Sequence, residues 1–174
     1  MKHKLLALAT AAAALSPMVA SASDGTITFT GAVSAVTCTI GTPTFTVTLP
    51  TVSTSTLAQA NDTAGTTRFV IAITGCNVGL TDANAYFEAG PNVDSSTGRL
   101  KSTGTAANVD LQLLTASGAA INLSKPYSEP QYTLQADNIV SGGAVLEYAV
   151  RYFATGVSTA GTVSSTLTYS VVYN

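Results

Sequence analysis

Histidine, tryptophan and charged residues are scarce in this sequence of 174 residues. The only histidine, His3, lies within the first 22 residues, and tryptophan is absent. For the chain after residue 22, a Ser-His-Asp triad, a Cys-His dyad and a histidine-ligated zinc site are therefore excluded. Charged residues make up 9% of the chain, against about 25% in typical soluble proteins. This composition argues against most classes of enzyme.

The chain also lacks an excess of positive charge. Its net charge is −2, and removal of residues 1–22 takes away Lys2 and Lys4 and leaves −4. A nucleic-acid-binding protein needs a basic face, so nucleic acid is excluded as a partner. The nine acidic residues mostly stand singly in predicted turns or at strand ends. We therefore expect no enzyme activity, although folding can still bring together the two carboxylates that a glycosidase requires.

Three residues offer oxygen ligands of the kind that calcium prefers, namely Asp82, Asn84 and Asp94. Their spacing matches no known calcium loop, and turn formation is the better interpretation of these residue types. We expect neither a metal nor a cofactor.

The N-terminus has the pattern of a secretory signal peptide. Two lysines precede an apolar run over residues 5–15, and the segment ends in Ala20-x-Ala22. The alternative is a membrane anchor, but a run this short cannot span roughly 30 Å of hydrocarbon as a helix. We expect cleavage after Ala22, and the remaining length suits one domain.

Export to an oxidising compartment favours a disulfide between Cys38 and Cys76, the only cysteines. A cross-link over this separation stabilises a fold by about 4 kcal/mol in the chain-entropy treatment. Two free thiols are the alternative, for which the sequence offers no catalytic partner.

Alternation of apolar and polar residues, rather than a helical period, dominates the rest of the chain and predicts β-strands. Glycine- and proline-containing turns separate these segments, which favours a β-sandwich or barrel. Residues 51–63, polar and rich in alanine, are expected to hold a loop or a helical turn. The predicted strands are residues 26–33, 45–49, 69–73, 86–88, 109–113, 121–123, 132–134, 145–153 and 163–173.

Both ends of the chain after residue 22 alternate in this way, over residues 23–36 and 162–174. Two ordinary sandwich strands are one interpretation. Exchange of a strand between subunits is the other, because a strand added to an open edge supplies backbone hydrogen bonds while alternate side chains fill pockets.

Several segments, in the same order along the chain, resemble the chaperone–usher pilins, including type 1 major pilins and Bordetella serotype fimbrial subunits. Tyr173 is penultimate and Gly161 is the fourteenth residue from the C-terminus, both as in that family. The similar segments are residues 24–33 followed by Cys38, residues 65–76, 85–91, 151–156 and 169–174.

The resemblance implies an all-β fold, an incomplete immunoglobulin-like β-sandwich that lacks its last strand and has an N-terminal donor-strand extension. It divides the chain into a signal peptide (1–22), the donor extension (23–36) and the pilin domain (37–174). A periplasmic chaperone first fills the groove left by the missing strand. At the outer-membrane usher, the extension of a neighbouring subunit replaces the chaperone.

Carried over to this sequence, the resemblance assigns a role to each of the following residues. Cys38 and Cys76 form the family disulfide, and Tyr173 with Asn174 anchors the chaperone. The donor strand presents Gly25, Ile27, Phe29, Gly31 and Val33, with Gly25 filling its pocket poorly. The acceptor groove and chaperone-binding strand comprise Gly161, Val163, Leu167, Tyr169, Val171, Tyr173 and Asn174.

The expected function is that of a structural subunit of a fimbria, exported through the periplasm to the cell surface and supporting adhesion. Its expected partners are copies of the same or related subunits, the chaperone and the usher. The alternative is a minor adaptor or tip subunit that binds a receptor directly, and the sequence identifies no receptor.

Overall fold

The computed structural model describes residues 28, 30, 38–132 and 137–173. The chain divides into two units, Met1–Val33 and Ser34–Asn174, and the architecture below is that of the second unit. In the first unit, Thr28 and Thr30 are both exposed. The predicted signal segment, the five predicted donor residues Gly25, Ile27, Phe29, Gly31 and Val33, and Asn174 lie outside the described residues.

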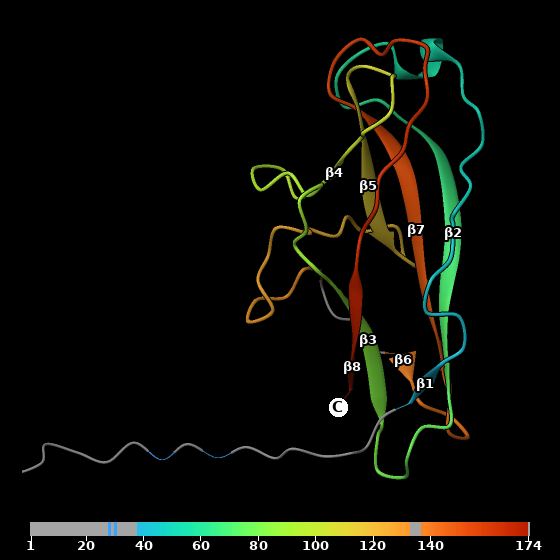
Figure 1. Cartoon of the computed structure of the whole chain (residues 1–174), viewed down its shortest axis with the longest axis vertical. Helices are drawn as coiled ribbons and strands as arrows, with labels where there is room; N and C mark the ends of the chain where they lie inside the picture. The colour runs from blue at the N-terminus through green and yellow to red at the C-terminus, as the bar shows by residue number, and fades with distance from the viewer. Residues whose placement is uncertain (1–27, 29, 31–37, 133–136, 174) are drawn as a thin grey trace, which may run out of the picture. The chain divides into compact units, whose positions relative to one another are not determined.

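Two antiparallel sheets make up the fold of the described residues (Figure 1). The larger has the order β1-β2-β7-β5-β4, and the smaller has the order β6-β3-β8. The strands of the larger sheet are β1 (Thr39–Ile40), β2 (Thr63–Thr74), β4 (Leu100–Lys101), β5 (Val109–Thr115) and β7 (Ala144–Ala154). Those of the smaller sheet are β3 (Asp82–Phe87), β6 (Asp137–Asn138) and β8 (Tyr169–Tyr173).

The core lies between the two sheets and follows from the alternation along their strands. Ile71 of β2 is paired with Leu146 of β7, and both are buried. In the smaller sheet, β3 buries Ala83, Ala85 and Phe87. Because successive side chains of a strand point to opposite faces, each sheet contributes every second residue to this core.

Strand β3 is paired on one side by β8 and, beyond the short β6, by side chains on the other. Tyr148 Oη accepts a hydrogen bond from the Ala85 N–H at 2.9 Å, and Tyr132 Oη donates to the Ala85 carbonyl at 2.9 Å. Gln131 bonds both backbone groups of Phe87, at 3.0 and 2.6 Å. Burial raises the pKa of Tyr132 and of Tyr148, so both hydroxyls stay protonated at neutral pH.

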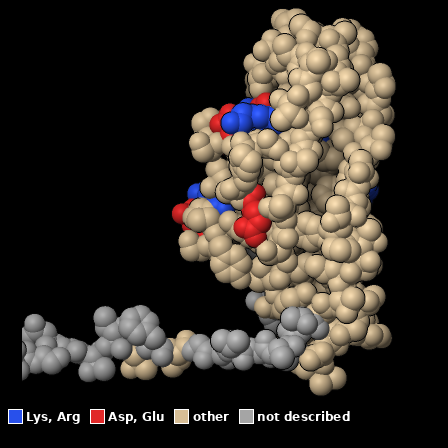
Figure 2. All heavy atoms as spheres, in the orientation of Figure 1, with Lys and Arg blue, Asp and Glu red and all other residues tan. Residues whose placement is uncertain are grey.

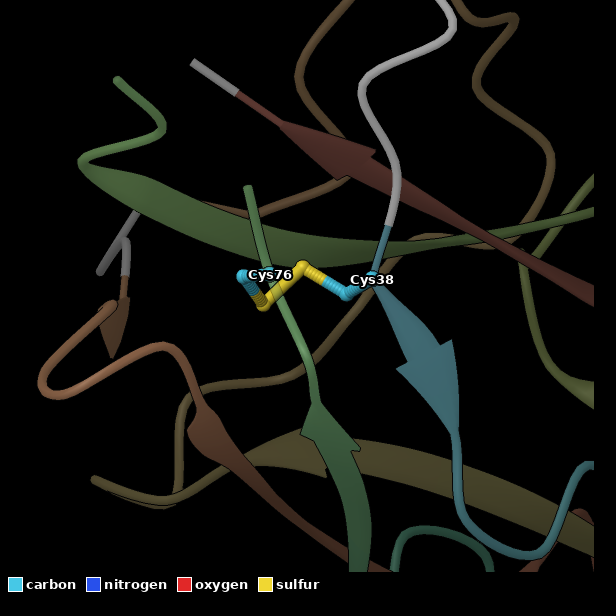
Figure 3. The surroundings of a disulfide bond; sticks show 2 residues. All are labelled: Cys38 and Cys76. Carbon is cyan, nitrogen blue, oxygen red and sulfur yellow. A yellow bond between two sulfur atoms is a disulfide. The ribbon is translucent and has the colours of Figure 1, made fainter. Parts of the chain in front are cut away.

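The disulfide between Cys38 and Cys76 is confirmed, with an S–S distance of 2.00 Å. Cys38 directly precedes β1, and Cys76 follows the end of β2 (Figure 3). The bond therefore ties the start of the described domain to the end of its longest strand.

The structure corrects three of the predicted strands. Residues 45–49 and 163–168 are extended but belong to no strand, and residues 121–123 follow an isolated bridge at Ala120. Alternation reports that one face of a segment is buried, whereas a strand also needs a hydrogen-bonded neighbour. Residues 133 and 134 of the predicted strand 132–134 are not described.

The expected helical turn within residues 51–63 is a 3-10 helix, Thr54–Leu57, whose N-cap Ser53 accepts a hydrogen bond from the Ser55 N–H. Within the described part of the chain, no helix has the length and apolar character needed to cross a membrane.

Candidate functional site

An apolar groove of about 570 Å³ opens between two extended segments, residues 43–49 and residues 165–169, called the first wall and the second wall below. None of the described residues that line it is charged. The face shown in Figure 2 likewise carries few charged side chains. The floor consists of core residues of both sheets: Ile40, Phe69, Ile71, Phe87, Leu100, Leu111, Leu113 and Val150.

The first wall is held by side chains rather than by a ladder of backbone hydrogen bonds. It follows β1 and runs up alongside β2 in Figure 1. Val47 and Leu49 are partly buried against the core, and the ring of Phe45 lies 6.0 Å from that of Phe69. Among the described residues, no backbone hydrogen bond is made by residues 44–51.

The second wall leads into β8. The wall and the residues just before it form backbone hydrogen bonds on one side only among the described residues. The carbonyls of Thr162, Ser164 and Thr168 accept hydrogen bonds from the N–H groups of Ala106, Thr103 and Glu88, at 3.0, 2.7 and 2.9 Å. These are alternate residues, and in an extended chain the residues between them present their backbone groups to the opposite side. The backbone groups of residues 163, 165 and 167 have no partner among the described residues.

One hydrogen bond joins the two walls within the described part of the chain. Tyr169 Oη donates to the Pro43 carbonyl at 3.1 Å. Burial raises the pKa of Tyr169, so the hydroxyl stays protonated and remains a donor at neutral pH. The groove therefore offers apolar surface and unpaired backbone groups, with no carboxylate or other charged side chain for acid–base chemistry.

The described acceptor residues that were predicted lie in β8 or in the segment that precedes it, and their surroundings differ. Leu167 and Tyr169 line the groove. Val171 and Tyr173 lie further along β8 and pack against the main core, and Val163 packs there and against a second cluster that contains Leu57, Val109 and Ala154. Gly161 is exposed, with its backbone close to Thr105 and Ala106.

The sequence did not identify the first wall or most of the floor as part of this site. The alternation of Phe45, Val47 and Leu49 was the available signal, but it predicted a paired strand. The floor brings together residues of β1, β2, β3, β4, β5 and β7. Only the topology shows that these strands meet beneath one opening.

The calcium candidates behave as turn and strand residues. Asp94 accepts hydrogen bonds from the Ser96 N–H and hydroxyl, at 2.8 and 2.6 Å, which hold the pKa of its carboxyl below the usual range. Asp82 and Asn84 belong to β3. No group of three or more potential metal ligands occurs among the residues that the structure describes.

Known structures share the fold of this chain. A subunit of a chaperone–usher pilus aligns over 100% of its own length with 91% of this chain, at a TM-score of 0.61 and 18% identity. The P pilus rod subunit PapA aligns with 79% of this chain and 99% of its own, with a TM-score of 0.60 and 16% identity. The chain therefore has the pilin fold that the sequence predicted, a sandwich with an unpaired edge at β8.

Residues 49–174 match the family "Type-1 fimbrial protein, A", and the chain belongs to this family of fimbrial subunits. It is 42% identical over 174 residues to the major fimbrial subunit SMF-1 of Stenotrophomonas maltophilia, covering 92% of this chain and 99% of the relative. The F17 fimbrial protein of Escherichia coli is 41% identical over 170 residues, with 92% and 93% covered. The serotype 2 fimbrial subunit of Bordetella pertussis is 33% identical over 193 residues, with 94% and 93% covered.

Proposed function

We propose that the chain is a major structural subunit of a surface fimbria and polymerises by donor-strand exchange. In this proposal, residues 23–36 of one copy insert between the two walls of the next. The single observation that carries it is the groove, whose floor is apolar and whose two walls contain backbone groups that have no partner among the described residues. An extended strand supplies the two things that are missing, hydrogen bonds and apolar side chains at alternate positions.

The predicted donor segment has the matching pattern. Ile27, Phe29 and Val33 alternate with threonine and alanine, so one face of an extended strand is apolar. Insertion would cover apolar groove surface, at roughly 25 cal/mol for each Å² removed from water. A periplasmic chaperone would cover the groove until the subunit reaches the outer-membrane usher, because an open apolar edge strand promotes aggregation.

A major subunit is favoured over a minor one because the 42% identical relative is a major fimbrial subunit. A minor adaptor would share the groove and the mechanism, and copy number in the filament separates the two. Receptor binding by the chain itself has no specific observation in its favour.

Polymerisation is tested by running the surface fraction on an SDS gel with and without boiling. Non-covalent strand exchange predicts a ladder of high-mass bands that collapses on boiling to one band near the mass of the chain without residues 1–22. A single monomer band in both lanes would contradict the proposal.

The donor assignment is tested by Phe29→Asp, with Thr28→Asp as the matched control. The first substitution places a charge in an apolar groove, at a cost of several kcal/mol, and should abolish the ladder. The second places the same charge on the opposite face of the strand and should leave the ladder intact. Equal ladders from both variants would show that this face of residues 23–36 does not enter the groove.

A further inference from the structure

The first wall needs an external support. Residues 44–51 make no backbone hydrogen bond to any described residue. The segment is held below by the Gly41 N–H, which donates to the Ala72 carbonyl at 3.1 Å, and above by the capped 3-10 helix. Between these points, the described residues restrain it only by side-chain packing and by the hydrogen bond from Tyr169.

Tyr169 is itself rigidly placed. It stands opposite Phe87 in the ladder between β3 and β8, and the neighbouring Thr168 carbonyl accepts from the Glu88 N–H at 2.9 Å. Its ring lines the groove, and its hydroxyl reaches the first wall at Pro43. Strand β8 is thus fixed by its pairing with β3, and it holds the less restrained first wall through the side chain of Tyr169.

The separation of the walls matters because one strand must fit between them. Strands in a sheet lie about 4.8 Å apart, so walls that both pair with an inserted strand must be about 9.6 Å apart. An empty apolar groove favours approach of its walls, since approach removes apolar surface from water. A planar ring between the walls opposes that approach, and its hydroxyl bond opposes outward movement.

We propose that Tyr169 is a positioning residue for strand uptake, which holds the first wall at a separation that admits one extended strand. The inference rests on the proposed function, because it names a residue that prepares the same groove. Because the first wall is already in place, it does not have to be ordered when a strand binds, and the free-energy cost of binding is lower.

The test uses the full secreted chain and a fluorescent peptide with the sequence of residues 23–36. Three chains are compared: the unsubstituted chain, Tyr169→Phe and Tyr152→Phe. Tyr152 is the matched control because its hydroxyl has no partner among the described residues. Because the chain's own residues 23–36 compete with the peptide for the groove, the fraction of open grooves is measured for each chain and uptake rates are compared per open groove.

We expect Tyr169→Phe to take up the peptide about two- to tenfold more slowly, the effect of one lost hydrogen bond, while Tyr152→Phe matches the unsubstituted chain. A general loss of stability would instead lower the thermal midpoint and leave the association rate unchanged, so both are measured. Equal or faster uptake by Tyr169→Phe overturns the inference and leaves the proposed function standing. Failure of all three chains to bind the peptide overturns the proposed function and the inference with it.

Discussion

Gln131, Tyr132 and Tyr148 occupy the edge of β3 that, beyond β6, is covered by no strand of the described residues. Together they bond both backbone groups of Ala85 and of Phe87, and the Tyr132 and Tyr148 hydroxyls lie 3.1 Å apart. The hydrogen bonds from Gln131 also fix the backbone of Phe87, which forms part of the groove floor. Polar side chains thus satisfy one edge of the smaller sheet, while the edge at β8 stays open.

Replacement of Gln131 by alanine should lower the free energy of unfolding by about 1–3 kcal/mol, because buried backbone groups of Phe87 lose their partner. The exposed Gln59, whose side chain makes no hydrogen bond to a described residue, provides the control Gln59→Ala. Urea denaturation of the two variants measures the difference. Equal midpoints would show that water or a rearranged side chain satisfies Phe87 equally well.

At the scale of elements, the segment that leads into the second wall depends on two glycines, Gly104 and Gly161. Residues 102–106 and 161–164 approach so closely that a Cβ at Gly104 would overlap the Thr162 carbonyl, and one at Gly161 would overlap the Ala106 backbone N. Close backbone approach is a known use of glycine within extended structure. This contact fixes the wall on the side away from the groove.

We expect Gly161→Ala to destabilise the chain by about 1–3 kcal/mol, the usual effect of forcing extra atoms into a packed contact. Gly90→Ala is the control, since no atom lies within 4 Å of the position that its Cβ would take. Thermal unfolding of both variants, compared with the unsubstituted chain, measures the effect. If both alanines are tolerated equally, the two segments separate without loss and the glycine is not needed for their approach.

The sequence predicted the long elements well and the groove only in part. Strands β2, β5 and β7 were visible because each buries alternate apolar residues over many positions. The two-residue strands β1, β4 and β6 are too short to carry a pattern. Leu167 and Tyr169 were predicted as groove residues from the resemblance, whereas Phe45 and Leu49 were read as part of an ordinary strand. What distinguishes these walls from strands is a missing neighbour, and a sequence pattern does not report the partner of an edge.

At the scale of the whole molecule, the disulfide and the open groove act on the same part of the fold. The bond joins Cys38, which precedes the first wall by a few residues, to Cys76 at the end of β2. An exposed apolar edge makes partly unfolded chains prone to aggregate. A cross-link that lowers the population of such chains should therefore raise the yield of folded protein.

The double variant Cys38→Ser, Cys76→Ser should be less stable by up to about 4 kcal/mol, the chain-entropy value for a loop of this size. If the chain is exported and assembled as proposed, its yield in the periplasm should fall, because a larger fraction of the chains is unfolded before a neighbour covers the groove. Urea denaturation with and without a reductant provides the internal control. The reductant should lower the midpoint of the unsubstituted chain toward that of the double variant and leave the double variant unchanged. An unsubstituted chain that is insensitive to reductant, together with a normal yield of the variant, would show that packing of the two sheets alone holds the first wall and β2 together.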